Sequence, residues 1–384
     1  MQKPFILGPV IVAALFAAPA GAATASLTRA WQFQPAEAAA LAVDNLIGNV
    51  AIEAATDGGF HVTATIRTEA GSQADADALA RAVDFRTEDA GPRSRFQVLL
   101  PEASFPVIHD PKAARGSWFG RSYVDYLGKR REISDDARKA VKVRVDLAIR
   151  VPGSMALSVN NRLGLIESRG VKADLSLDTA RGSIASRDGR GSLVADTGSG
   201  AVAVASHEGK VDADTGSGEI SIIDCTCDIS ADTGSGAVRI LRGSGSVDAD
   251  TGSGGVEVRD FAGSVSADTG SGGVSLTGLS AVRTLVADTG SGSVRIEGDL
   301  AALERLDVDT GSGAVTVAAS AWPDMRIRMD VGSGSIEADV PGAELRRDGR
   351  RSAEVTLGAG THRGKIDTGS GGIRLTQAAA SAAD

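Results

Sequence analysis

Residues 193–204 read LVADTGSGAVAV, and this stretch decides how the chain folds. Its central pentapeptide, Asp-Thr-Gly-Ser-Gly, recurs at intervals of 18, 18, 18, 18, 20 and 21 residues and returns once more after a wider gap. The strict copies begin at Asp196, Asp214, Asp232, Asp250, Asp268, Asp288, Asp309 and Asp367, and a relaxed copy, Asp-Val-Gly-Ser-Gly, begins at Asp330. A period near 20 residues is the signature of a stacked repeat architecture.

Apolar residues alternate with polar ones on both sides of each pentapeptide. In the first unit, Leu193 and Ala195 precede the turn, while Val202 and Val204 follow it. This alternation places the four side chains on one face of two short strands. Such a strand pair cannot bury its apolar face alone, so we expect each coil to stack on the next. The prediction is an all-β chain: a β-solenoid, similar to a parallel β-helix, of about twelve 18–21-residue coils.

The pentapeptide itself suits a sharp corner. We expect its Asp to accept backbone N–H groups in an Asx-turn and its two glycines to supply positive φ. Stacking would then place the Asp residues in one structural column, whose neighbours repel by about 1 kcal/mol in water. We expect turn N–H groups and solvent to neutralise this column, in preference to bridging calcium ions, because the spacing is not that of calcium-binding β-rolls.

Asp-Thr-Gly-Ser is also the local sequence of aspartic-protease active sites. Those enzymes need two carboxylates that face each other across a two-fold cleft, whereas tandem copies stack in parallel on one edge. The four histidines, His61, His109, His207 and His362, are scattered and match no metal-ligand or triad spacing. We therefore predict no catalytic residues, no cofactor, no metal ligands and no enzymatic activity.

The N-terminal segment predicts that the protein is exported, and the overall charge bears on its partners. Residues 1–23 combine Lys3, an apolar run and small-residue cleavage sites, which is typical of a secretory signal peptide. No later stretch is long and apolar enough to span a membrane, and a net charge of −9 argues against nucleic-acid binding. The two cysteines, Cys225 and Cys227, could form a small disulfide or remain two small apolar residues.

The rest of the chain divides around the repeats. Residues 24–100 are predicted as a β-rich part of the solenoid domain, with a strand at 61–67 and a short helix at 73–83 capped by Ser72. Residues 141–376 hold the solenoid repeats. They include a 37-residue gap between Asp330 and Asp367, close to two coils, in which a turn is expected at Asp348. Residues 377–384 are predicted as a disordered tail.

Residues 101–140 interrupt the pattern and are predicted as an irregular insertion, partly helical near 135–140. Residues 112–150 hold 11 Lys and Arg against 5 Asp and Glu, and both tyrosines of the chain lie among them. Aromatic side chains beside cations suit a glycan, an anionic headgroup or a protein partner. The alternative is that they fold back and cap the end of the solenoid core. The predicted partner-binding residues are Trp118, Phe119, Tyr123, Tyr126, Lys129, Arg130 and Arg131.

Three stretches resemble the putative-adhesin family of exported bacterial β-solenoid proteins, a domain of unknown function. They are VDNLIGNVAI at 43–52, VRVDLAIRVPG at 143–153 leading to NNRLG at 160–164, and the repeated DTGSG-x-V. The resemblance covers roughly residues 41–375. It implies a place in the periplasm or at the cell surface of a bacterium, with a cell-envelope component, glycan or protein as partner. It carries no established catalytic residues.

We therefore predict a non-enzymatic exported β-solenoid protein, an adhesin or cell-envelope scaffold that acts by surface binding. A glycan-acting β-helix enzyme is the first alternative, and it would need paired carboxylates beside aromatic side chains in a groove. A calcium-binding repeat protein is the second.

Overall fold

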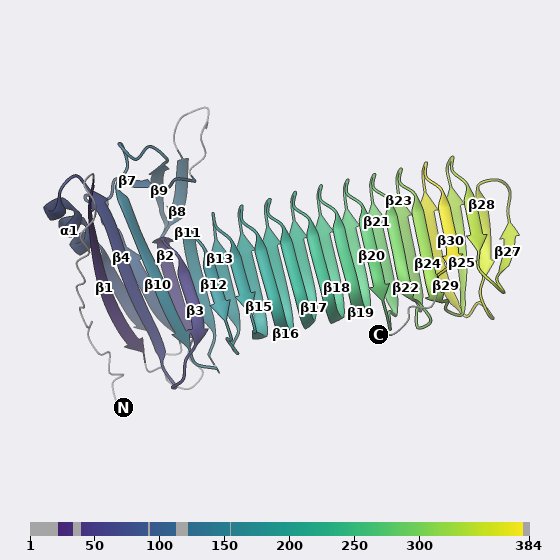
Figure 1. The fold of residues 1–384 in the computed structure, drawn as a ribbon, viewed down its shortest axis with the longest axis horizontal. Coiled ribbons are helices and arrows are strands. Elements are labelled where there is room, and N and C mark those ends of the chain that lie inside the picture. Colours follow the sequence, from purple (N-terminus) through teal and green to yellow (C-terminus); the bar gives the residue numbers. More distant parts are fainter. Residues whose placement is uncertain (1–21, 34–39, 91–92, 113–121, 154, 379–384) are drawn as a thin grey trace. The chain divides into compact units, whose positions relative to one another are not determined.

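The computed structural model describes residues 22–33, 40–90, 93–112, 122–153 and 155–378 (Figure 1). Nearly all of the expected signal peptide, the side chains of Trp118 and Phe119, and the last six residues lie outside this described part. Within it the chain is all-β, with 30 strands and the single helix α1 (Gln73–Ala82). No helix in the described part is long and apolar enough to cross a membrane. The chain divides into two compact units, Met1–Ser199 and Gly200–Asp384, which are described separately.

Unit 1 begins with an antiparallel sheet. Strand β4 (Phe60–Ala70) lies between β1 (Ala23–Phe33) and β10 (Lys142–Val151) and pairs antiparallel with both. Helix α1 packs on β1 and β4, and the Ser72 hydroxyl accepts the N–H of Asp75 at 3.2 Å, which confirms the predicted cap. Strand β5 (Asp84–Ala90) pairs antiparallel with β6 (Arg93–Leu99).

Parallel pairing takes over in the rest of unit 1. Strand β2 (Ala40–Ile47) pairs with β6 on one side and with β11 (Leu157–Leu163) on the other. In the register of β11, Asn160 lies opposite Asp44 on one side and opposite Asp178 on the other, and Asp178 in turn lies opposite Asp196. The remaining strands of this ladder are β3 (Val50–Ala54), β12 (Ile166–Arg169), β13 (Leu175–Thr179), β14 (Ile184–Arg187) and β15 (Arg190–Thr197). The degenerate copies at 44–48 and 160–164 therefore occupy the same turn as the strict ones.

Part of the segment that we predicted as irregular is a separate three-stranded sheet. Strand β9 (Lys129–Ser134) pairs in parallel with β7 (Val107–His109) and antiparallel with β8 (Ser122–Tyr126). Leu127 and Gly128 have φ of 51° and 72°, which makes a two-residue hairpin turn between β8 and β9. The predicted helix near 135–140 is wrong, because this stretch forms only one turn, closed at the Asp136 carbonyl.

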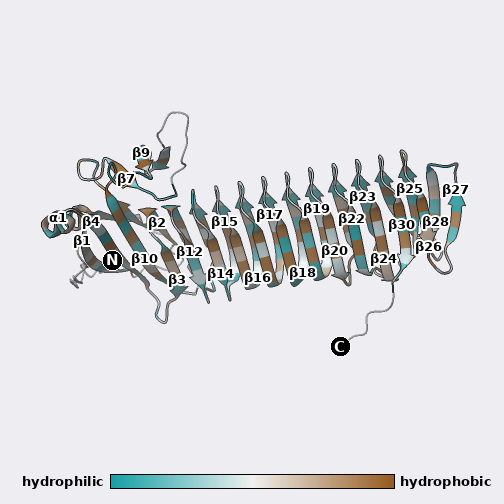
Figure 2. Ribbon diagram, turned by 45° about the horizontal axis from the view of Figure 1, so that its top comes forward, coloured by the Kyte–Doolittle hydropathy of each residue, from teal (hydrophilic) through white to brown (hydrophobic). Residues whose placement is uncertain are grey.

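Unit 2 is a long sheet of mostly parallel strands. Strands β16 (Val202–Thr215), β17 (Ile220–Thr233), β18 (Val238–Thr251) and β19 (Val256–Thr269) pair in parallel, each with the residue 18 positions later. Val202, Ile220 and Val238 lie opposite one another and are fully buried, so the predicted apolar columns are confirmed. Apolar and polar residues alternate along these strands (Figure 2).

Shorter strands continue this ladder with the same parallel pairing. They are β20 (Val274–Leu279), β21 (Thr284–Thr289), β22 (Val294–Asp299), β23 (Arg305–Thr310) and β24 (Val315–Ala321). The offset grows to 20 and then 21 residues, as the intervals between pentapeptides indicate, and the extra residues enlarge the loops without disturbing the register at Thr269, Thr289 and Thr310.

The C-terminal coils do not follow sequence order. Strand β29 (His362–Thr368) lies between β23 and β25 (Met325–Val331), so Asp367 has Asp309 on one side and Asp330 on the other. Strand β30 (Ile373–Gln377) likewise lies between β24 and β26 (Ile336–Asp339). The 37-residue gap is therefore not two successive coils. Part of it forms β27 (Glu344–Arg347) and β28 (Ser352–Thr356), an antiparallel hairpin that turns at Asp348 and covers the outer edge of β25.

The pentapeptide forms its corner in a different way from the one predicted. Its Thr side chains are buried at 197, 215, 233, 251, 269, 289, 310 and 368. The Thr233 hydroxyl accepts the N–H of Gly236 at 3.1 Å and donates to the carbonyl of Gly218, one coil earlier, at 3.0 Å. Threonine, not Asp, thus caps the turn, because its side chain points inward toward both backbone groups.

The expectation of positive φ at the pentapeptide glycines is also wrong. Gly218 and Gly236 do not have φ in the left-handed range. A Cβ at Gly236 would lie 1.7 Å from the carbonyl oxygen of Gly218, which belongs to the coil beneath it. Glycine is required here because successive corners touch through their backbones, so no side chain fits between them.

Candidate functional site

The Asp column lies on the outside of the corners. The side chains of Asp196, Asp214, Asp232, Asp250, Asp268, Asp288 and Asp309 are exposed, and those of Asp330 and Asp367 are half-buried. Partial burial and the neighbouring carboxylates Asp232 and Asp248 raise the pKa of Asp250. The pKa of Asp268 is raised in the same way, by partial burial and then by Asp288 and Asp250. Repulsion between neighbouring carboxylates therefore contributes at Asp250 and Asp268, whereas hydrogen bonds from Ser352 and Arg328 lower the pKa of Asp330.

The column does not supply the geometry of an aspartic-protease site. Asp232 and Asp250 lie opposite each other on parallel strands, so both side chains point the same way instead of facing across a cleft. No group of three or more His, Cys, Asp or Glu side chains in the described part is placed to hold a metal ion. The column repeats one carboxylate per coil, whereas calcium sites combine six to eight oxygen ligands.

The predicted partner-binding residues separate into two groups. Tyr123 and Arg130 pair across β8 and β9, with the guanidinium 4.2 Å from the ring centre, and Arg130 and the neighbouring Lys129 are exposed. Tyr126 is 6% exposed and Arg131 is 8% exposed. Trp118 and Phe119 lie outside the described residues. Alternation along β9 puts Arg130 on the same side of the hairpin as Tyr123, whereas Lys129, which pairs with Tyr126, belongs to the other side.

Tyr126 and Arg131 hold this small sheet in place. The Tyr126 hydroxyl lies 2.7 Å from the carbonyl oxygen of Val98 and 2.9 Å from that of Asp44, either of which it can donate to. Burial and the nearby Asp44 carboxylate raise the pKa of Tyr126 well above its ordinary value. Arg131 donates to the carbonyl of Phe105 at 2.8 Å. Tyr126 thus attaches the hairpin to β2 and β6, and Arg131 attaches it to the segment between β6 and β7, so the two residues have a packing role.

A cleft of about 950 Å³ opens in unit 1 beside the small sheet. Its lining comes from strands β1, β4 and β10, from the corners at 47–49, 163–165 and 181–183, and from residues 109–112. The charged lining residues are Arg67, Glu69, Asp110, Lys112, Lys142, Arg144 and Arg181. Sequence reasoning predicted none of these as site residues. The local excess of Lys and Arg over 112–150 includes Lys112, Lys142 and Arg144, but it gives no signal for Arg67 or Arg181.

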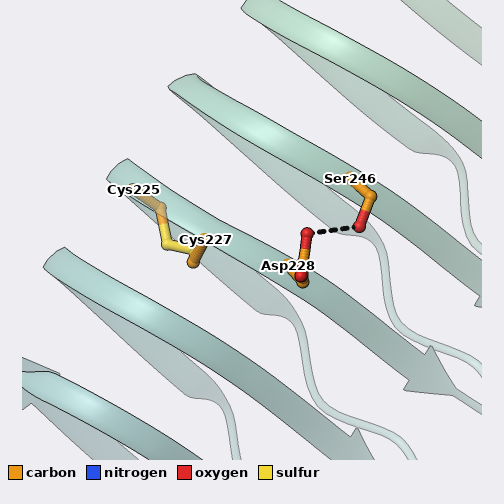
Figure 3. Close-up of a disulfide and its surroundings, with 4 residues drawn as sticks. All are labelled: Cys225, Cys227, Asp228 and Ser246. Carbon is orange, nitrogen blue, oxygen red and sulfur yellow. Dashed lines mark hydrogen bonds between the residues drawn. A yellow bond between two sulfur atoms is a disulfide. The ribbon is translucent and has the colours of Figure 1, made fainter.

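The two cysteines form a disulfide within one strand. Cys225 and Cys227 both lie in β17 with their Cα atoms 5.5 Å apart, and both are buried (Figure 3). Alternation along the strand puts residues two apart on the same face, which allows the bond. Beside it, the Ser246 hydroxyl of β18 donates to the Asp228 carboxylate at 2.6 Å. The disulfide therefore joins two residues of one strand and crosslinks no separate segments.

Comparisons with known proteins give no close relative. No family model matches the chain, and no curated protein matches it. A putative cell adhesion protein from Clostridium sporogenes is similar over 98% of this chain and 100% of its own, with 10% identity and a TM-score of 0.20. A putative adhesin from Bacteroides fragilis covers 91% and 96%, with 10% identity and a TM-score of 0.25. A putative lipid binding protein from Parabacteroides distasonis covers 90% and 96%, with 10% identity and a TM-score of 0.27. At these TM-scores the likeness carries no argument.

Proposed function

We propose that this chain is an exported β-solenoid protein that acts by binding, as an adhesin or scaffold at the bacterial cell envelope or surface. The solenoid assignment is supported by parallel pairing of each strand with its counterpart one repeat later, as for Val202, Ile220 and Val238. It is further supported by the corner of each coil resting on the corner before it, as Gly236 rests on Gly218.

One observation supports the non-enzymatic part of the proposal: the Thr and Gly residues of the recurring motif form contacts between neighbouring turns. Thr233 is buried and bridges two coils, and Gly236 touches the backbone beneath it. Asp232, the only member of this copy with an ionisable side chain, points outward in parallel with Asp250. Because the motif serves packing, we expect the binding function to lie on surfaces outside the repeat.

The exposed side of the β8–β9 hairpin is one such surface. Tyr123 and Arg130 combine an aromatic ring with a cation there, and Tyr126, on the other side, bonds the hairpin to β2 and β6. Rings paired with guanidinium groups are frequent anchors at binding interfaces, because they bury a large area and still form polar contacts.

The proposal is tested with the purified exported protein in a sedimentation assay against bacterial envelope fragments, alongside assays for released reducing sugars and peptides. We expect the protein to sediment with the fragments and to release neither product. The Arg130→Ala variant should bind more weakly, whereas Arg283→Ala, which removes an exposed arginine of unit 2, should bind as the parent does. Release of sugar ends would favour the glycan-acting enzyme. A need for calcium would favour the calcium-binding repeat.

A further inference from the structure

Two exposed arginines lie side by side in the lining of the unit 1 cleft. Arg67 of β4 and Arg144 of β10 are direct partners in the antiparallel register, and their side chains are 58% and 47% exposed. Like charges placed directly opposite each other destabilise a sheet. Both guanidinium groups here bond to the one carboxylate of Asp146, which also accepts the N–H of Asn49 at 2.8 Å. The group therefore keeps one positive charge in excess.

Among the remaining charged residues of the cleft, one adds to that positive excess. Lys142 pairs with Glu69, and Arg181 lies 3.5 Å from the carboxylate of Asp110, so these two pairs are balanced. Lys112 also lines the cleft and contributes a further cation, and its backbone N–H donates to Asp110 at 3.0 Å. The described residues thus give the cleft five cations against three carboxylates, Asp146 included, in a chain whose net charge is −9.

The uncharged lining of the cleft is partly polar and partly apolar. Thr24 and Ser26 of β1 bring hydroxyl groups beside the cations. The cleft also has apolar surface, to which Ile47, Pro111 and Leu165 contribute. The carbon atoms of a sugar ring can pack on this surface while its hydroxyl groups form hydrogen bonds with Thr24, Ser26 and the cations. A volume of about 950 Å³ lies at the upper end of ligand sites.

We propose that this cleft binds an acidic glycan, a chain of sugars that carries carboxylate or sulfate groups. Arg67 and Arg144 would take one acidic group in paired, charge-assisted hydrogen bonds, and Lys112 would meet a second acidic group. The inference rests on the proposed binding function and deepens it by naming the chemistry of the ligand. It assigns recognition to β4, β10 and residues 109–112 rather than to the repeats.

The test measures binding of defined probes to the full exported chain by isothermal titration. The probes are an oligogalacturonate and a heparin-derived tetrasaccharide, with maltotetraose as the neutral match. Inorganic phosphate and phosphatidylglycerol vesicles serve as non-glycan anions. We expect binding of at least one acidic oligosaccharide, weakened by salt, and no binding of maltotetraose. Equal or tighter binding of phosphate or of the vesicles would overturn the assignment to a glycan.

Matched variants locate the site. Arg67→Gln combined with Arg144→Gln should weaken binding about tenfold or more, and Lys112→Gln alone should weaken it by a smaller factor. The control is Arg305→Gln, because Arg305 forms the same Arg-x-Asp pair with Asp307 on an exposed strand of unit 2. Circular dichroism checks that each variant is folded. Unchanged affinity in both cleft variants would overturn the proposal, as would an equal loss in the control.

This experiment separates the two proposals. If the chain sediments with envelope fragments but binds none of the acidic oligosaccharides, the cleft assignment fails and the binding function stands. If an oligosaccharide binds in the cleft and is then cleaved, the cleft assignment stands and the non-enzymatic function fails.

Discussion

The corners of unit 2 and the early corners of unit 1 close the same turn with different side chains. In unit 2, buried Thr233 links Gly218 to Gly236, and the neighbouring copies repeat this arrangement. In unit 1, Asn45 and Asn161 occupy the equivalent place, fully buried, and their amides bond to each other at 2.9 Å. Where the copies are identical, the surface repeats. Arg67 and Arg144 lie outside the repeats, on the antiparallel strands β4 and β10, where the surface holds individual side chains.

The comparison predicts its largest effect at the stacked glycines. Gly236→Ala would place a Cβ within 1.7 Å of the Gly218 carbonyl oxygen, so two corners must separate. We expect a loss of about 3 kcal/mol or more in the free energy of unfolding, measured by chemical denaturation. The control is Gly71→Ala, where a Cβ would meet nothing within 4 Å and should leave stability unchanged or slightly raised. Equal effects of the two substitutions would contradict the backbone contact.

The next effect concerns the buried hydroxyl. Thr251→Val removes the donor to the Gly236 carbonyl and the acceptor of the Gly254 N–H while keeping the side chain's shape. We expect a loss of about 1–3 kcal/mol in the free energy of unfolding, because buried polar groups lose their partner. Thr251→Ser retains the hydroxyl and should recover most of this loss. A serine variant as unstable as the valine variant would show that the methyl group matters more.

Replacing the asparagine of an early corner with threonine should change the free energy of unfolding by a smaller amount. Asn161→Thr removes the acceptor of the Asn45 amide but can donate to the Gly48 carbonyl, which Asn161 now reaches at 3.0 Å. We expect it to cost about 1 kcal/mol, and Asn161→Val to cost more because both bonds are lost. Thermal denaturation followed by circular dichroism compares the two. If Asn161→Thr proves the less stable variant, the corners are not interchangeable.

The smallest effect is expected at the exposed Asp column. A raised pKa means that the folded state holds the proton of Asp250 more tightly than the unfolded state. Its contribution to stability therefore falls as the pH rises above its ordinary value of 3.8 through the raised pKa. Asp250→Asn should thus stabilise the protein at pH 7 by a few tenths of a kcal/mol, roughly, after solvent screening. The gain should shrink near pH 4 and in high salt. A loss of stability at pH 7 would mean that a cation holds the column together.

The sequence predicted the parts of the fold that depend on local pattern. Strict alternation fixed the strands, and the 18-residue interval fixed the parallel register, as the pairing of Val202 with Ile220 confirms. The helix cap at Ser72 was equally predictable, because it involves a residue three positions away. Burial of the threonines also follows from this alternation, since Thr197 lies two positions after the buried Ala195, whereas their hydrogen bonds to the preceding corner depend on stacking.

The remaining differences arise from contacts between distant segments. Strand β29 enters between β23 and β25, which no interval between pentapeptides can indicate. The cleft draws on Arg67, Arg144 and Arg181, whose proximity depends on antiparallel pairing and on the position of the 109–112 segment. Trp118 and Phe119 were predicted because they are aromatic residues in a basic segment. The roles of Tyr126 and Arg131 follow only from their buried hydrogen bonds.

The central claim is that the recurring motif builds the stack through its Thr and Gly and leaves its Asp outside. Denaturation of Thr233→Val and Asp232→Asn, two neighbours in one copy, tests it most directly. We predict that the valine variant loses about 1–3 kcal/mol of the free energy of unfolding and that the asparagine variant loses nothing. A severe loss of stability in Asp232→Asn, with Thr233→Val unaffected, would contradict the claim and show that the carboxylate stabilises the turn.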